Sequence, residues 1–212
     1  MQYRLRLAST SPRRRALLPL LGFPVESLAV DIDERPRESE SPAQTALRLA
    51  EAKALASGPP LDNRQAVVGS DTIVVLEDAQ LGKPTDAADA RRMLAELRGR
   101  RHQVITGVAL MGADQTHCGS VTTNVRMRAY TDDEIEQYVA SGRSQDKAGA
   151  YAIQDTDFGP VERIDGCYLN VVGLPLCAVS RGLRALGWPL ADEEFVPPCR
   201  FCLAGHEALI TR

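Results

Sequence analysis

A carboxylate inside a run of aliphatic residues is the feature that most constrains how this chain can fold. Residues 66–84 read AVVGSDTIVVLEDAQLGKP, and their valines and isoleucine predict a buried β-strand with Asp71 in its middle. Because side chains alternate between the two faces of a strand, Asp71 shares a face with Val67, Ile73 and Val75. A buried carboxylate is stable only when a cation or hydrogen-bond donors meet it. The fold must therefore bring such a partner to Asp71.

A lysine lies close to this carboxylate in the sequence. The turn after the strand contains Leu81-Gly82-Lys83-Pro84, which supplies an ammonium group. Two interpretations are open at this point: a structural ion pair between Asp71 and Lys83, or a charged site that binds a ligand. The other charged motifs of the chain bear on the choice.

The N-terminal motif is typical of anion binding. Residues 3–8 alternate apolar and polar side chains as a strand does, and Ser11 and Pro12 predict the N-cap and the first residue of a helix. The free N–H groups at a helix start favour a phosphate, and Arg13 and Arg14 add two guanidinium groups. The coincidence of strand, cap and arginines favours a phosphate site over a solvated basic turn.

An acidic group follows the next extended segment. Residues 23–32 predict that segment, and Asp31, Asp33 and Glu34 lie at its end. The three carboxylates form either a solvated turn or a set of oxygen ligands for a hard cation. Their spacing alone favours the solvated turn.

A helix begins at Ser41 and Pro42 and carries a second lysine of interest. Its apolar positions recur with helical spacing at Ala43, Ala46, Leu47, Ala50 and Ala54. Lys53 falls close to this stripe, so its ammonium either extends to solvent or reaches into a cleft.

The remaining elements alternate helices with strands. The patterns predict a helix over 86–98, antiparallel strands over 102–110 and 120–128, a helix from Thr131 to Gly142, a strand of small residues leading to Gln154, a strand pair over 163–172 and a helix over 176–186.

Composition limits the classes of protein that are possible. The 212 residues suffice for one large domain or two small lobes. A net charge of -3 argues against a general nucleic-acid binder. The chain has no run of about 18 apolar residues, which predicts no membrane span, and the charges in residues 1–6 do not fit a signal peptide. We therefore expect a cytoplasmic protein, and the five cysteines do not indicate a disulfide framework.

The C-terminal extension, residues 189–212, contains Cys199, Cys202 and His206 at zinc-like spacing. A closed zinc site needs a fourth ligand, and the sequence offers none nearby. A flexible tail with unrelated thiols is therefore favoured over a zinc site.

With these motifs identified, the chain resembles the Maf family of nucleoside triphosphate pyrophosphatases. Each motif is modest alone, but together and in order they are highly specific. The similarity covers residues 4–187 and rests on LASTSPRR (7–14), RLAEAKA (48–54), GSDTIV (69–74), LGKP (81–84), HQVITGV (102–108), DKAGAYAIQ (146–154) and NVVGLP (170–175).

The resemblance implies a fold and an activity for residues 1–188. The implied fold is α/β, a mixed twisted sheet with flanking helices and two lobes around a nucleotide-binding cleft. The implied activity is hydrolysis of a nucleoside triphosphate to the monophosphate and pyrophosphate, in a homodimer, with Mg²⁺ or Mn²⁺. Arg13, Thr72 and Gln154 resemble the residues found in the branch of the family that prefers dTTP and UTP. Modified pyrimidine nucleotides are further candidate substrates.

The resemblance also implies residue roles. Asp71 would act as general base or metal ligand and position water against the α-phosphorus, and Glu34 would share the cation. Thr72 and Gln154 would select the base. The charge of the triphosphate would be neutralised by Ser9, Arg13, Arg14, Lys53 and Lys83. The family often has Ser where this chain has Arg35, and an arginine beside Glu34 would weaken metal binding there.

Two other functions remain as alternatives. A non-catalytic regulator of cell division would hold a triphosphate with the same cations without cleaving it, although such a protein would be expected to have lost Asp71, Glu34 or one of the lysines. A zinc-dependent interaction module would rest on the C-terminal extension alone. Metal content and turnover distinguish these functions.

Overall fold

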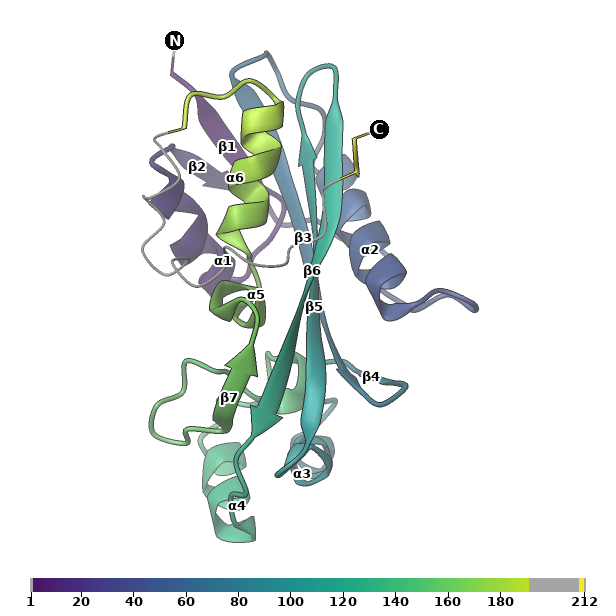
Figure 1. Cartoon of the computed structure of the whole chain (residues 1–212), viewed down its shortest axis with the longest axis vertical. Helices are drawn as coiled ribbons and strands as arrows, with labels where there is room; N and C mark the ends of the chain where they lie inside the picture. The colour runs from purple at the N-terminus through teal and green to yellow at the C-terminus, as the bar shows by residue number, and fades with distance from the viewer. Residues whose placement is uncertain (1, 191–209, 212) are drawn as a thin grey trace.

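The computed structural model describes residues 2–190 and the backbone of residues 210 and 211. Strands β5 and β6 run along the length of the molecule, with helices beside them (Figure 1). In chain order the elements are β1 (Arg4–Leu7), α1 (Pro12–Leu17), the 3₁₀-helix η1 (Leu18–Leu21), β2 (Val25–Ser27), α2 (Pro42–Ala56), β3 (Gln65–Leu76), β4 (Ala79–Leu81), α3 (Ala87–Leu97), β5 (Arg101–Met111), β6 (Thr116–Met127), α4 (Asp132–Ala140), the 3₁₀-helix η2 (Ala148–Ala150), β7 (Val161–Asp165), α5 (Tyr168–Val172), α6 (Leu176–Ala185) and β8 (Ile210–Thr211).

One mixed sheet organises the fold. Its strand order is β2-β1-β3-β5-β6-β7, with β4 beside β3 and β8 beside β6. Strand β1 is parallel to β2 and β3, and the remaining described pairings are antiparallel. The mixed α/β sheet with flanking helices that the sequence predicts is confirmed.

The strand that contains Asp71 has an open edge in its middle. Strand β3 pairs with β1 as far as Leu7↔Val68, and its pairing with β4 begins at Val74↔Leu81. Between these two pairings, residues 69–73 pair with β5 on one side. No strand of the described chain pairs with them on the other side. Asp71 therefore lies at a gap in the sheet, between two partly separate halves of the molecule.

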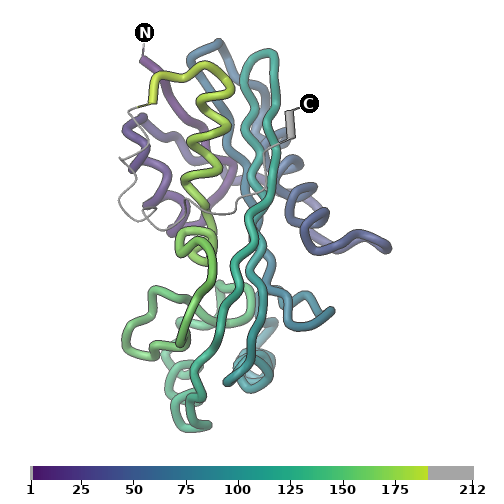
Figure 2. The backbone as a smooth tube through the Cα atoms, viewed as in Figure 1, coloured from purple at the N-terminus to yellow at the C-terminus, as the bar shows by residue number. Residues whose placement is uncertain are grey.

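Each half has its own hydrophobic core. One core joins β1 and η1 to α6 through Leu5, Leu18 and Leu183, so that segments far apart in sequence lie side by side at one end (Figure 2). The other core joins the end of β3 to α3 and α4, and Leu94 and Tyr138 are among its buried residues. The long strands β5 and β6 connect the two cores, which accounts for two lobes built on one sheet.

Helix α2 packs unusually close to the sheet because both surfaces consist of small residues. A Cβ atom added at Gly69 would lie 2.0 Å from the carbonyl oxygen of Ala50, and one added at Gly107 would lie 2.2 Å from that of Ala46. Only glycine permits this approach. The helix begins at the predicted residue, with a capping box between Ser41 and Gln44.

Most predicted elements are present, and three predictions are wrong in part. The extended segment over 23–32 contains only the short strand β2. No strand forms over 148–154, because Gly149 and Ala150 have φ values of +69° and +61° and form η2 instead. The strand pair over 163–172 is replaced by β7 followed by α5. Helix α5 begins where the Cys167 sulfur accepts a hydrogen bond from the N–H of Asn170.

Two further expectations from the sequence concern a membrane span and a zinc site. Within the described ranges, none of the helices is long and apolar enough to span a membrane. Cys199, Cys202 and His206, considered above as zinc ligands, lie outside the described residues.

A buried histidine makes the stability of this fold depend on pH. His102 of β5 is 3% exposed, and its Nε2 lies 2.7 Å from the Tyr151 hydroxyl. Burial lowers the pKa of His102 to about 4, from about 6.5 in an unfolded chain. Between these pKa values the unfolded state binds a proton that the folded state does not bind. The contribution of His102 is therefore fully present above pH 6.5 and is lost as the pH falls toward 4.

We expect His102 to remove about 3 kcal/mol from the free energy of unfolding between pH 7 and pH 4. Urea unfolding of the wild type and of His102→Gln at both pH values measures the loss due to His102, because the carboxylates titrate alike in both proteins. The wild type should lose more stability than the variant. Equal losses in the two proteins would contradict the prediction.

Candidate active site

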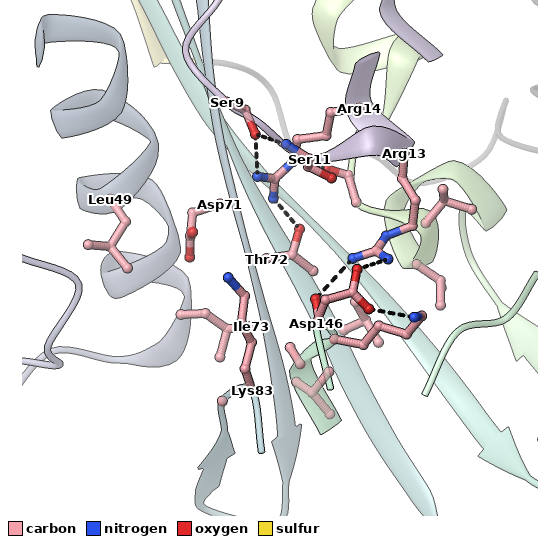
Figure 3. A pocket seen from close by; sticks show the side chains of 18 of the residues that line it. Ser9, Ser11, Arg13, Arg14, Leu49, Asp71, Thr72, Ile73, Lys83 and Asp146 are labelled. Carbon is pink, nitrogen blue, oxygen red and sulfur yellow. Dashed lines mark hydrogen bonds and ion pairs between the residues drawn. The ribbon is translucent and has the colours of Figure 1, made fainter. Parts of the chain in front are cut away.

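A cleft of about 680 Å³ opens at the free edge of β3, and both lobes line it. Figure 3 shows its floor, with Asp71 and Thr72 on β3 and the arginines of α1 opposite Lys83. All nine residues to which the family resemblance gives a role line this cleft: Ser9, Arg13, Arg14, Glu34, Lys53, Asp71, Thr72, Lys83 and Gln154. The fold thus brings together residues that are spread over most of the chain.

Asp71 is met by a lysine, but not by the one nearest in sequence. The Nζ of Lys53 lies 2.6 Å from Asp71 Oδ1 and 2.6 Å from Glu34 Oε1. Lys53 is 8% exposed, so its ammonium is held inside the cleft wall and does not extend to solvent. The structural ion pair between Asp71 and Lys83, one of the two interpretations left open by the sequence, does not form: among the described residues Asp71 pairs with Lys53. The reason is that Asp71 faces α2, and the close packing of α2 on Gly69 brings Lys53 within reach.

The same lysine sets the charge of Glu34. Partial burial alone would raise the pKa of Glu34, but the hydrogen bond and the charge of Lys53 outweigh it and hold this pKa below its ordinary value. Glu34 is therefore ionised at neutral pH. Two carboxylates converge on one ammonium at this position.

Arg14 is fixed at the floor of the cleft. Its Nε donates to the carbonyl oxygen of Gly173 at 2.8 Å, and its two other nitrogens donate to Thr72 Oγ1 at 3.0 Å and to Ser9 Oγ at 3.4 Å. Burial lowers the pKa of Arg14, while the negative charge of Asp71 opposes that effect. Ser11 occupies the predicted N-cap, but its side chain makes no capping bond. The arginine side chains, more than the six-residue helix, thus supply the positive charge.

Arg13 crosses the mouth of the cleft. Its Nη1 lies 3.2 Å from Asp146 Oδ2, and the other oxygen of Asp146 lies 2.5 Å from Lys147 Nζ. Burial raises the pKa of Asp146. The hydrogen bonds and charges of Lys147 and Arg13 have a larger combined effect, and they hold this pKa below its ordinary value. The sequence marked residues 146 and 147 as a charged turn and did not indicate this contact between the lobes.

Lys83 and Gln154 are exposed, and neither makes a side-chain hydrogen bond or ion pair within the described chain. Both side chains are therefore available to a ligand. Lys83 extends from the loop after β4 toward the floor of the cleft (Figure 3).

Two carboxylates of the cleft, Glu34 and Asp71, have the chemistry of ligands for a hard divalent cation. No group of three or more His, Cys, Asp or Glu side chains is arranged to hold a metal in the part of the chain that the structure describes. Asp71 and Glu34 each direct one carboxylate oxygen at Lys53 Nζ, and Mg²⁺ is commonly held by one or two carboxylates together with phosphate groups. Arg35 pairs with Asp33 at 2.7 Å rather than with Glu34, and this contact lowers the pKa of Asp33.

Comparison with known proteins gives consistent names. The model of the family described as "Maf-like protein" matches residues 4–186. A protein of Geobacter metallireducens named dTTP/UTP pyrophosphatase is 48% identical over 186 residues, which cover 87% of this chain and 96% of that protein. A protein of Thermomicrobium roseum with the same name is 45% identical over 203 residues, 92% of this chain and 91% of that protein.

A solved structure gives a weaker likeness. The nucleoside-triphosphatase, or dITP/XTP pyrophosphatase, of Mycobacterium abscessus is 18% identical with a TM-score of 0.42, over 87% of this chain and 97% of that one. A likeness of this size does not bear on the fold or the function of the chain.

Proposed function

The chain belongs to the Maf-like protein family, and we propose that it hydrolyses the nucleoside triphosphates dTTP and UTP to the monophosphate and pyrophosphate. Relatives that share nearly half of its residues over almost their whole length are named dTTP/UTP pyrophosphatase. Those names favour an enzyme over a non-catalytic regulator of cell division. Modified pyrimidine triphosphates are further candidates, and their removal would limit the incorporation of non-standard nucleotides.

One observation carries this proposal: two carboxylates that share a buried lysine lie at the centre of a cleft rich in cations. Asp71 and Glu34 meet Lys53 at 2.6 Å each, and four further cations line the same cleft: Arg13, Arg14, Lys83 and Lys147. A triphosphate needs this density of positive charge, because most of the catalysis of phosphoryl transfer comes from positioning and charge stabilisation. A structural ion pair alone would not need five cations around an open cleft.

In this proposal the cations bind the phosphates and Asp71 orients the attacking water. Arg14 is held in place by three hydrogen bonds, so it meets the phosphates without losing much conformational freedom. Ser9 Oγ lies 3.4 Å from Arg14 Nη1, so both side chains would contact the phosphates together. Asp71 accepts a proton from water directed at the α-phosphorus, and Lys53 holds the Asp71 carboxylate in position.

We include a divalent cation, Mg²⁺ or Mn²⁺, in the proposal. Asp71 and Glu34 would hold it together with the phosphates, and when bound it would supply charge neutralisation on the triphosphate.

The choice of base is assigned to Arg13, Thr72 and Gln154. The amide of Gln154 offers both a donor and an acceptor, which matches the adjacent carbonyl and N–H groups of thymine and uracil. We further propose that the enzyme works in the cytoplasm as a homodimer and has no nucleic-acid partner. These last features rest on the family resemblance and on the net charge of -3.

The expected products test the function directly. Incubation with a panel of ribo- and deoxynucleoside triphosphates and Mg²⁺ or Mn²⁺ should release pyrophosphate chiefly from dTTP and UTP. The assay must separate pyrophosphate from orthophosphate. Binding of these nucleotides without any release would favour the regulator instead.

The role of Asp71 can be tested by one substitution. Asp71→Asn keeps the shape of the side chain and removes its charge and basicity, so turnover should fall by about 10²–10⁴-fold while nucleotide still binds. Asp78→Asn, on the exposed turn between β3 and β4, is a matched control and should keep wild-type turnover. Unchanged turnover in Asp71→Asn would exclude Asp71 as the catalytic residue.

A further inference from the structure

Behind the cleft, a chain of hydroxyl groups connects Arg14 to a buried backbone carbonyl. Arg14 Nη2 donates to Thr72 Oγ1 at 3.0 Å, and Thr72 Oγ1 lies 3.0 Å from Thr106 Oγ1. Thr106 Oγ1 then donates to the carbonyl oxygen of Asn170 at 3.1 Å. Thr106 is fully buried on β5, opposite Thr72 in the strand register, whereas Thr72 lines the cleft.

The number of protons fixes the direction in which the hydrogen bonds between these hydroxyl groups run. A hydroxyl group has a single proton to donate, and a carbonyl oxygen can only accept. The proton of Thr106 goes to Asn170, so the proton of Thr72 must point to Thr106. The reverse arrangement would remove the Thr106 donor from the Asn170 carbonyl.

The end of the chain is held firmly. The Nδ2 of Asn170 donates to the carbonyl oxygen of Val104 at 2.8 Å and to Thr123 Oγ1 at 2.9 Å, which fixes α5 against β5 and β6. The carbonyl oxygen of Gly173, just after α5, accepts from Arg14 and from Ser70 Oγ. The acceptor of the Thr106 proton therefore cannot easily move away, because these bonds tie its helix to the sheet.

We propose that Thr106 is a positioning residue for base selection: it fixes the hydroxyl direction of Thr72, so that Thr72 offers the cleft an acceptor only. The proposal rests on the proposed function, in which Thr72 contacts the base. An acceptor-only group suits the ring N3–H of uracil and thymine, which is a donor. It is unfavourable to cytosine, whose N3 is an acceptor, because two acceptors then face each other without a proton.

Thr106→Val tests the proposal, because valine has nearly the shape of threonine but cannot form the hydrogen bonds. The Thr72 hydroxyl would then be free to rotate and donate to cytosine. We expect the ratio of kcat/KM for UTP to that for CTP to fall about tenfold, the effect of one hydrogen bond, with kcat/KM for CTP rising. Thr106→Ser keeps the hydroxyl and should keep the wild-type ratio.

The comparison separates positioning from a merely structural role. A structural defect would lower kcat/KM for UTP and CTP equally, and an unchanged ratio in Thr106→Val would overturn the proposal. If Thr106→Val does not fold, Thr106→Ala removes the same hydroxyl without new contacts and carries the same expectation. A wild type that releases no pyrophosphate from any nucleotide would overturn the proposed function, whereas an active wild type with an unchanged ratio in the variant overturns this inference alone.

Discussion

The contact of Lys53 with Asp71 and Glu34 is the interaction on which the site depends. A carboxylate on a central strand requires a partner, and this lysine meets it from α2 at 2.6 Å. The contact is possible because α2 packs on glycines at positions 69 and 107, where any larger residue would clash with the helix backbone. The small residues of the helix and the sheet thus decide the electrostatics of the cleft as well as the packing.

The open edge of β3 gives this charged group access to a ligand. Strand β3 exchanges its partner from β1 to β4, and the residues between the two pairings face a cleft instead of a third strand. Arg13 and Arg14 approach from one lobe and Lys83 from the other. A chain of hydroxyl groups on the opposite face of β3 then holds Arg14 and orders Thr72. Both faces of a single strand therefore contribute to the site.

The sequence predicted which residues line the cleft better than it predicted their contacts. Strand, helix and motif patterns are local, so the strand around Asp71 and the helix before Lys53 could be read directly. The partner of Asp71 could not, because it depends on how closely α2 approaches the sheet. Helix α5 and the turns around Gly149 were mistaken for strands, since left-handed backbone angles and a cysteine cap leave little trace in hydrophobic periodicity. The positioning role of Thr106 could not be predicted from the sequence, because a buried threonine is common in strands.

The cleft is expected to direct water at the α-phosphorus of a nucleoside triphosphate. Hydrolysis in ¹⁸O-labelled water, followed by mass spectrometry of both products, tests it most directly. Attack at the α-phosphorus places the label in the nucleoside monophosphate and leaves the pyrophosphate unlabelled, which is the result we expect. Label in the pyrophosphate would mean attack at the β-phosphorus and would contradict it.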